Sequence, residues 1–326
     1  GLIMAYSTII KPNTQMNPVT YTGNGTTQSI TGVNFQPDFV WVKSRNFAED
    51  HQLTDSVRGA TKVLQSNLNN LESTMTGGLT SFNVDGFSVG NQSDFNYNND
   101  ALISWNWKGG VSALTYSANN TAGATVGHGL GSVPEMIIVK EKSGSINDWT
   151  VYHVTQGNST RGVLNETNAW GSNAAWNNTT PTSSVFTIGS GSVVNRSGST
   201  YAAYCFAGVK GFSKFGSYVG NGNADGTFIY TGFKPAFYMY KRTDSTANWT
   251  IFDNKRNTFN EMGLQLHPNL DSVESFSSRG DFLSNGFKVR STAGSTNASG
   301  GNYIYMAFAE NPLVANTSGG IPTTAR

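Results

Sequence analysis

The chain of 326 residues has a formal net charge of +1, and only 13% of its residues are charged. So small a net charge gives no field that would attract nucleic acid or an anionic membrane surface. No apolar stretch reaches the roughly 18 residues of a membrane-spanning helix, and the single cysteine, Cys205, excludes a disulfide within the chain. We therefore expect no nucleic-acid partner, no membrane insertion, and a fold stabilised by packing or assembly.

Along the chain, one pattern recurs three times: an apolar residue, a proline, a short apolar run and a lysine. Other motifs recur around it in the same order, and each copy ends on an apolar closing strand. Self-similarity at a fixed period indicates an array of like units. The copies of the pattern are Phe35–Lys43, Val133–Lys140 and Phe233–Lys241, and the closing strands are expected at Ala101–Lys108, Tyr201–Gly208 and Tyr303–Glu310.

Strand signals dominate each copy. Short apolar runs such as Phe39–Val42 and Met136–Val139, bounded by proline and polar residues, are typical of buried strands. The prolines fit the first position of a strand, where a missing N–H costs least. Asp-Gly and Asn-Gly pairs mark tight turns. The sequence therefore predicts an all-β protein made of three tandem antiparallel β-sandwich, jelly-roll-like repeats of about 95 residues each.

The repeats define the expected domain organisation. An N-terminal arm at residues 1–18 is followed by sandwiches at 19–110, 111–212 and 213–312 and by a C-terminal tail at 313–326. The connections between sandwiches are short, so the units should pack on one another or share a sheet. One stretch, Thr54–Leu71, has apolar residues at near-helical spacing and predicts a short helix or helical turn with Asp55 as candidate N-cap.

The motifs that the copies share also predict the framework. Cys205 and most tryptophans lie in shared strands and should pack in the core. Trp107, Phe206 and Phe308 should occupy equivalent buried positions in the closing strands. The lysines of the recurring pattern should stand at strand ends with their ammonium groups in or near water. The tryptophans are Trp41, Trp105, Trp107, Trp149 and Trp249, and the lysines are Lys43, Lys140 and Lys241.

Two aromatic residues outside this framework are candidates for binding. Trp170 and Trp176 lie in the polar loop Asn168–Pro181. A tryptophan among Asn, Gly and Ser can stack on a sugar ring while amides bind its hydroxyls, so both residues are candidate glycan contacts. Trp170 has no counterpart in the other copies, and a loop plug or a subunit contact would explain it equally well. Trp176 has a loose counterpart in Phe276, which makes a core position the alternative.

No residues form a recognisable catalytic or metal-binding constellation. The carboxylates do not cluster as a pair for hydrolysis, and the four histidines are not at metal-ligand spacing. We therefore expect no enzyme activity, no metal and no cofactor.

Several long motifs resemble a family of uncharacterised repeat domains common in structural proteins of marine bacteriophages, often of the tail-fibre type. The resemblance covers about residues 19–312 and implies a β-sandwich virion protein without enzyme activity. The motifs are Tyr21–Arg45, Val126–Lys140, Gly232–Asp253, Asp281–Thr292 and Asn297–Pro312.

The array and the resemblance together favour a bacteriophage virion structural protein: a tail fibre, appendage or head-decoration subunit. Its expected partners are other virion proteins, further copies of itself in a homo-oligomer (a trimer is favoured) and host surface glycans. The first residues lack the basic start of a signal peptide, so the expected route to the virion surface is synthesis in the host cytoplasm and lysis. The alternatives are a carbohydrate-binding adhesin and, more remotely, a glycan-degrading enzyme.

Overall fold

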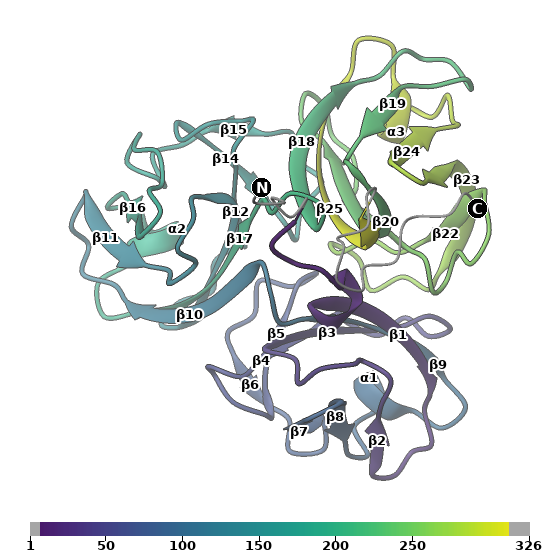
Figure 1. Cartoon of the computed structure of the whole chain (residues 1–326). Helices are drawn as coiled ribbons and strands as arrows, with labels where there is room; N and C mark the ends of the chain where they lie inside the picture. Colours follow the sequence, from purple (N-terminus) through teal and green to yellow (C-terminus); the bar gives the residue numbers. More distant parts are fainter. Residues whose placement is uncertain (1–6, 313–326) are drawn as a thin grey trace, which may run out of the picture.

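A computed structural model describes residues 7–312 of the chain and confirms the predicted all-β fold (Figure 1). Three β-sandwiches surround the centre of the molecule as three lobes, here called units 1, 2 and 3 in chain order. The short 3-10 helix η1 (Pro12–Thr14) precedes the first sandwich. Within the described residues, no helix has the length and apolar character needed to cross a membrane.

Each unit has two antiparallel sheets. The one that contains the closing strand is called the larger sheet here and the other the smaller sheet; they differ in strand number in units 1 and 2, whereas both have four strands in unit 3. Unit 1 contains β1 (Met16–Thr22), β2 (Gln28–Ile30), β3 (Phe39–Ser44), β4 (Gln52–Asp55), β5 (Lys62–Gln65), β6 (Ser73–Thr74), β7 (Leu79–Asn83), β8 (Gly86–Val89), α1 (Ser93–Asn96) and β9 (Ala101–Trp107). Unit 2 contains β10 (Val111–Ser117), β11 (Ala124–Gly127), β12 (Pro134–Ser143), β13 (Thr150–His153), β14 (Thr160–Val163), β15 (Gly171–Ser172), β16 (Val185–Ile188), α2 (Ser192–Asn195) and β17 (Thr200–Ala207). Unit 3 contains β18 (Ser213–Val219), β19 (Phe228–Tyr230), β20 (Phe233–Arg242), β21 (Thr250–Asp253), β22 (Met262–Gln265), β23 (Ser275–Leu283), β24 (Gly286–Val289), α3 (Gly294–Asn297) and β25 (Asn302–Pro312).

The larger sheets share one strand order. They run β1-β9-β3-β4-β5-β6, β10-β17-β12-β13-β14-β15 and β18-β25-β20-β21, so each closing strand (β9, β17 or β25) lies between the first and third strands of its unit. The smaller sheets are β2-β8-β7, β11-β16 and β19-β24-β23-β22. The register pairs Trp107 with Phe39, Phe206 with Met136 and Phe308 with Phe237. The three aromatic residues are therefore equivalent, as predicted.

The closing strands are buried on both faces. In β17, Tyr201, Ala203 and Cys205 point into the core between the two sheets of unit 2. The alternate residues of the strand, Tyr204 and Phe206 among them, point to the centre of the molecule. Successive side chains of a strand face opposite sides, which explains why these strands read as continuous apolar runs. The predicted burial of Cys205 is confirmed.

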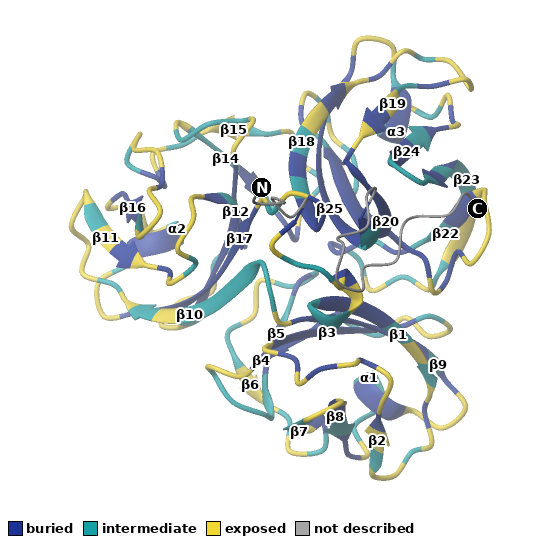
Figure 2. Ribbon diagram, in the orientation of Figure 1, coloured by how far each residue is buried: buried dark blue, intermediate teal, exposed yellow. Residues whose placement is uncertain are grey.

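A single aromatic core at the centre joins the three units. The larger sheets turn their buried faces toward it, while exposed residues gather on the outer loops (Figure 2). The ring centroids of Trp107, Phe206 and Phe308 form a triangle with sides of 6.3, 5.8 and 6.2 Å. The expected core tryptophans are all buried: Trp41, Trp105, Trp107, Trp149 and Trp249. Packing of the units on one another therefore occurs through the sheets and not only through the linkers.

The short helix expected at Thr54–Leu71 does not form, but the Gly59 N–H donates to the Asp55 carbonyl at 3.0 Å, which fits the alternative of a single helical turn. This stretch forms the end of β4, a turn and β5. Asp55 does act as a cap, but in the turn, where its Oδ1 accepts the backbone N–H of Arg58 at 2.8 Å. The apolar spacing reflects strand residues such as Leu64, which is buried in the shared core, whereas Val57 is exposed.

The helices lie instead at α1, α2 and α3, where no helix was predicted. Each has four residues and ends on a buried asparagine. The asparagine side chain accepts a backbone N–H from the turn that follows the first strand of its unit, at 2.8 or 2.9 Å. The tyrosine just before that turn also binds the helix, since its hydroxyl donates to a helix carbonyl. These two contacts explain why the Tyr and Asn motif recurs in each unit. The asparagines are Asn96, Asn195 and Asn297, and the tyrosines are Tyr21, Tyr116 and Tyr218.

The placement predicted for the three lysines is also wrong. Lys43, Lys140 and Lys241 are buried, and each Nζ donates to the backbone carbonyl of the next residue at 2.8 Å. Burial lowers the pKa of each ammonium group to about 8. Each lysine comes two residues after a member of the shared core, namely Trp41, Ile138 or Met239, and so lies on the same inward face of its strand, without a short path to water.

The structure locates some of the expected boundaries of the three sandwiches. Strand β1 begins at Met16, within the 1–18 segment expected as an arm, and β25 ends at Pro312. The connections between units are short, since β10 follows β9 and β18 follows β17 after only a few residues. Residues 1–6 and the expected tail at 313–326 lie outside the described residues.

Candidate functional sites at the junctions between units

The three units contact one another in a cyclic order. The last residue of the fourth strand of each unit reaches the closing strand of the next unit. Asp55 accepts a hydrogen bond from the Tyr204 hydroxyl at 2.9 Å, and Asp253 accepts one from Nε1 of Trp105 at 3.0 Å. Between units 2 and 3, Nε2 of His153 lies 3.1 Å from the carbonyl oxygen of Tyr305. Unit 1 therefore contacts unit 2, unit 2 contacts unit 3, and unit 3 contacts unit 1.

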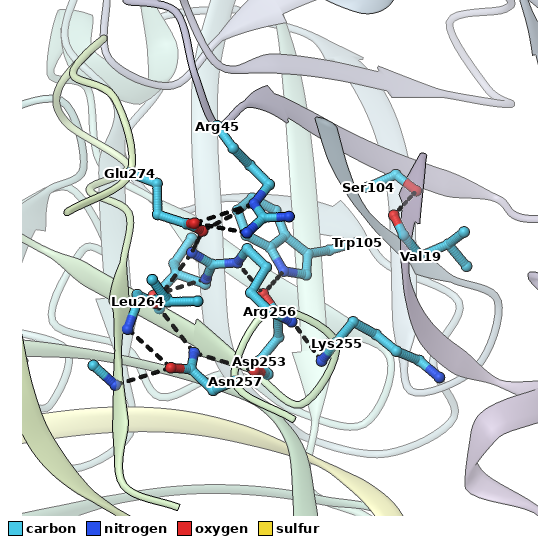
Figure 3. A network of polar contacts seen from close by, with 12 residues as sticks. Val19, Arg45, Ser104, Trp105, Asp253, Lys255, Arg256, Asn257, Leu264 and Glu274 are labelled. Carbon is cyan, nitrogen blue, oxygen red and sulfur yellow. Dashed lines mark hydrogen bonds and ion pairs between the residues drawn. The ribbon is translucent and has the colours of Figure 1, made fainter. Parts of the chain in front are cut away.

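The junction between units 3 and 1 is closed by buried ion pairs (Figure 3). Nε of Arg256 lies 2.6 Å from Oδ2 of Asp253, and its Nη1 lies 2.9 Å from Glu274. Glu274 also pairs with Arg45 of unit 1 at 2.7 Å. The Arg256 guanidinium stands 5.6 Å from the ring centroid of Trp105, in cation–π geometry. Each charge in this junction is thus paired or hydrogen-bonded, as buried charges require.

The junction between units 1 and 2 uses the same parts. Arg58 pairs with Asp55 within unit 1 and with Glu72 at 3.2 Å. Its Nη2 also donates to the Tyr204 hydroxyl of unit 2 at 2.9 Å. A tyrosine thus takes the place that Trp105 has at the other junction, and both supply a polar atom to the facing aspartate.

The junction between units 2 and 3 departs from this plan. His153 stands where the other units have aspartate, Gln156 where they have arginine, and Met306 where the facing closing strand has Trp105 or Tyr204. Burial lowers the pKa of His153 to about 4, so the imidazole is neutral at pH 7. Within residues 7–312, no ion pair joins units 2 and 3 at these positions.

Trp170 completes this third junction. Its backbone N–H donates to the carbonyl of Thr243 in unit 3 at 2.8 Å. Glu72 makes the same contact with Lys142, and Glu274 makes it with Arg45. The expectation that Trp170 lacks counterparts is therefore wrong. The residue types hide the correspondence, because Trp170 follows His153 by the same 17 positions that separate Glu72 from Asp55, but it is a tryptophan where the other units have glutamate.

The indole of Trp170 is half-buried at the edge of the shared core. Its Nε1 donates to Oγ1 of Thr160 at 2.9 Å, and its ring lies 6.3 Å from that of Trp249. Gly162 makes room for it, since a Cβ there would lie 2.2 Å from Cζ3 of Trp170. By strand register, Leu64 holds the position of Gly162 in unit 1. Part of the indole thus replaces a core leucine.

The remaining face of the junction is an open cleft of about 680 Å³ between units 2 and 3. Of the residues described by the structure, Asp244 is the only acidic or basic one that lines it, whereas glycoside hydrolysis commonly uses two carboxyl groups. The cleft therefore offers groups for binding. Besides Trp170, its polar lining includes Thr155, Gln156, Ser172, Ser217, Thr243 and Asn302.

Trp176, the other candidate glycan contact, cannot meet a ligand. It is 1% exposed in the core of unit 2, where its ring packs edge-on against Tyr152 and Phe186. Phe276, its supposed counterpart, is 67% exposed and so does not correspond to it. Within the described residues, no group of three or more His, Cys, Asp or Glu residues could hold a metal ion.

These features define a class: an all-β protein in which three antiparallel sandwiches close on a common aromatic core. The chain belongs to an uncharacterised domain family, described as "Domain of unknown function (DUF7483)", whose model matches residues 11–115 and 109–312. The second match begins at the connection between β9 and β10, and the first ends within β10, so the two overlap over residues 109–115. No curated protein matches the chain.

Proposed function

We propose that this protein is a structural, non-enzymatic component of a bacteriophage virion: a tail fibre, appendage or head-decoration subunit. The observation that carries the proposal is the shared aromatic core. Residues of all three sandwiches pack together in it, so the sandwiches form one body without a disulfide. Close-packed interiors transmit force with little deformation. Such a body suits a particle that must survive outside a cell, and the sequence resemblance to phage structural proteins points the same way.

Other virion proteins are the proposed partners, and the particle surface is the proposed location after synthesis in the host cytoplasm. A homo-oligomer, with a trimer favoured, stays part of the proposal. Its interface would use the outer loops or sheet edges. The inner faces of the larger sheets are not free for it, because they already pack against one another within a single chain.

Particles purified on a density gradient provide the test. Mass spectrometry should find the protein at stoichiometric amounts, and gold-labelled antibodies should place it on head, tail or fibre. Light scattering of the isolated protein would give its oligomeric state. A stable monomer of 35.0 kDa that never accompanies particles would contradict the proposal.

The second candidate function is a carbohydrate-binding adhesin that recognises the host surface. The cleft between units 2 and 3, with the half-buried indole of Trp170, favours it. Isolated protein should then compete with phage for adsorption to host cells, and weak sites would gain strength from many copies on a particle. A glycan-degrading enzyme is the remote alternative; new reducing ends in polysaccharide incubated with the protein would support it.

A further inference from the structure

We infer that the cleft between units 2 and 3 binds a neutral oligosaccharide, with Trp170 as the aromatic surface on which a sugar ring stacks. This inference deepens the adhesin function proposed above and rests on it. It names the site, its residues and the chemical class of the ligand.

The comparison of the three junctions singles out this cleft. At the other two, an arginine, an aspartate and a glutamate fill the space and satisfy one another. Here Gln156 and Trp170 take the places of the arginine and the glutamate, and an opening of about 680 Å³ is left. That volume falls within the range of about 300–1,000 Å³ that small-molecule sites occupy.

The cleft presents polar groups that the protein leaves unused. Among the described residues, no partner hydrogen-bonds to the side chains of Gln156, Ser172, Ser217 or Asn302, all of which line the cleft. Amides and hydroxyls both donate and accept, which matches the hydroxyl groups of a sugar. Gln156 and Ser172 come from unit 2, and Ser217 and Asn302 from unit 3, so a ligand would bridge two units.

The aromatic surface is fixed in place before any ligand arrives. The ring of Trp170 packs over Gly162, and its Nε1 is bound to Thr160. A ligand therefore need not order this side chain, which lowers the entropic cost of binding. The apolar face of a sugar ring can lie on an indole that is held in this way.

The charge of the cleft favours a neutral ligand. Asp244 stands at its rim, and Nε of Arg242 lies 2.8 Å from Oδ1 of Asp244. This hydrogen bond with Arg242 lowers the pKa of Asp244, so the carboxylate is ionised at neutral pH. A carboxylate accepts hydrogen bonds from sugar hydroxyls but repels sulfate, phosphate and uronate groups. Among the described residues, the lining has no other acidic or basic side chain, and the charge of Arg242 is already offset by Asp244, so an anionic glycan meets no uncompensated positive charge there.

The test uses the full chain with neutral tetrasaccharides of glucose, mannose and galactose as probes. A sulfated galactan tetrasaccharide is the anionic probe, and a chitosan tetramer is the cationic one. Saturation-transfer NMR and tryptophan fluorescence would detect binding up to about 10 mM ligand, which fills most of a site with a Kd of about 1 mM. At least one neutral probe should bind, and the anionic probe should not.

Variants locate the site. Trp170→Leu should weaken binding about tenfold, the factor that corresponds to one aromatic contact of about 1.4 kcal/mol. Ser217→Arg, at an exposed position, should block the cleft without touching the core. Gln156→Ala with Asn302→Ala removes side chains that have no protein partner in the described structure, so its fold should be kept even if Trp170→Leu unfolds. Phe276→Ala is the matched control, because this exposed aromatic also lies over a glycine but outside the cleft.

Three results would overturn the inference: no neutral probe binds, only the anionic or only the chitosan probe binds, or binding survives Ser217→Arg and the double variant. The virion proposal and the saccharide inference can be contradicted independently of each other. Protein present on particles without saccharide binding would overturn only the inference. Saccharide binding by a protein absent from particles would overturn only the virion role.

Discussion

The junction between units 3 and 1 and the junction between units 2 and 3 occupy the same place in the fold but are closed by different chemistry. In the first, Asp253 accepts the indole N–H of Trp105 and pairs with Arg256. In the second, Met306 holds the position of that indole, and the neutral His153 and Gln156 hold the positions of Asp253 and Arg256. The difference shows that a buried charge is kept only where the neighbouring unit supplies a hydrogen-bond donor, because an unpaired charge costs several kcal/mol.

A substitution in the shared core, which lies beneath both junctions, should give the largest loss of stability. Phe308→Ala removes a ring that packs against Trp107, Phe206 and Phe237 from all three units, and should lower the free energy of unfolding by about 3–5 kcal/mol. Urea unfolding followed by circular dichroism measures it. The exposed Phe276→Ala should change stability by less than about 0.5 kcal/mol. A loss confined to one unit, seen as a separate transition, would contradict a core shared by the whole molecule.

The ionic junction should be far more sensitive than the neutral one. Arg256→Ala leaves Asp253 buried without its partner and should cost about 3–5 kcal/mol. Gln156→Ala, at the equivalent position, should cost less than about 0.5 kcal/mol, because the side chain has no described partner. The two variants are compared by the same urea titration. Equal losses would mean that the two junctions do not differ as described.

The neutral junction should make the stability of the protein depend on pH. Burial lowers the pKa of His153 to about 4, whereas an unfolded histidine titrates near 6.5. Between these values the unfolded chain binds a proton that the native protein excludes, so stability present above pH 6.5 is lost as the pH falls toward 4. The loss approaches about 3 kcal/mol for this group. Most of that loss, about 2 kcal/mol, falls between pH 7 and pH 4.5. His153→Gln should therefore lose about 2 kcal/mol less stability than the parent protein between these two values, as measured by unfolding titrations at each pH. The same pH dependence in both proteins would show that His153 is not the cause.

Transplanting the ionic chemistry should give the smallest but most specific effect. His153→Asp places a carboxylate beside Met306, which cannot donate a hydrogen bond, and should destabilise the protein. Adding Gln156→Arg should restore part of the loss, with a coupling energy of about 0.5–3 kcal/mol between the two changes. A double-mutant cycle of unfolding free energies measures it. Additive effects would mean that residues 153 and 156 do not interact as Asp253 and Arg256 do.

Much of the fold could be predicted because its signals are local. The prolines lie at or near the start of the equivalent strands β3, β12 and β20, and the closing strands stand in register with them. The second face of each closing strand could not be placed, although runs such as Tyr201–Ala207 are apolar at every position. The residues that pack against this second face belong to other units, and no local sequence pattern predicts which they are.

The contacts of the candidate site between units could not be predicted from local patterns either. Trp170 was found as an unusual aromatic residue in a polar loop, yet its neighbours in unit 3 are far away in the sequence. Its equivalence to Glu72 and Glu274 follows from a shared backbone hydrogen bond and, for Glu72, from the matching registers of β5–β6 and β14–β15, neither of which leaves a trace in residue type. Trp176, in the same loop, is a core residue. Only the fold separates the two tryptophans.

The cyclic order of the contacts fixes the copy number of the sandwich. Each unit offers one surface to the next and receives another from the unit before, which is a head-to-tail interface that closes after three members. Closure leaves no such surface unmatched, whereas an array of two or four sandwiches would expose one of each kind. Those surfaces are complementary and would join chain to chain, so the gain or loss of a single repeat would turn a closed body into an open polymer.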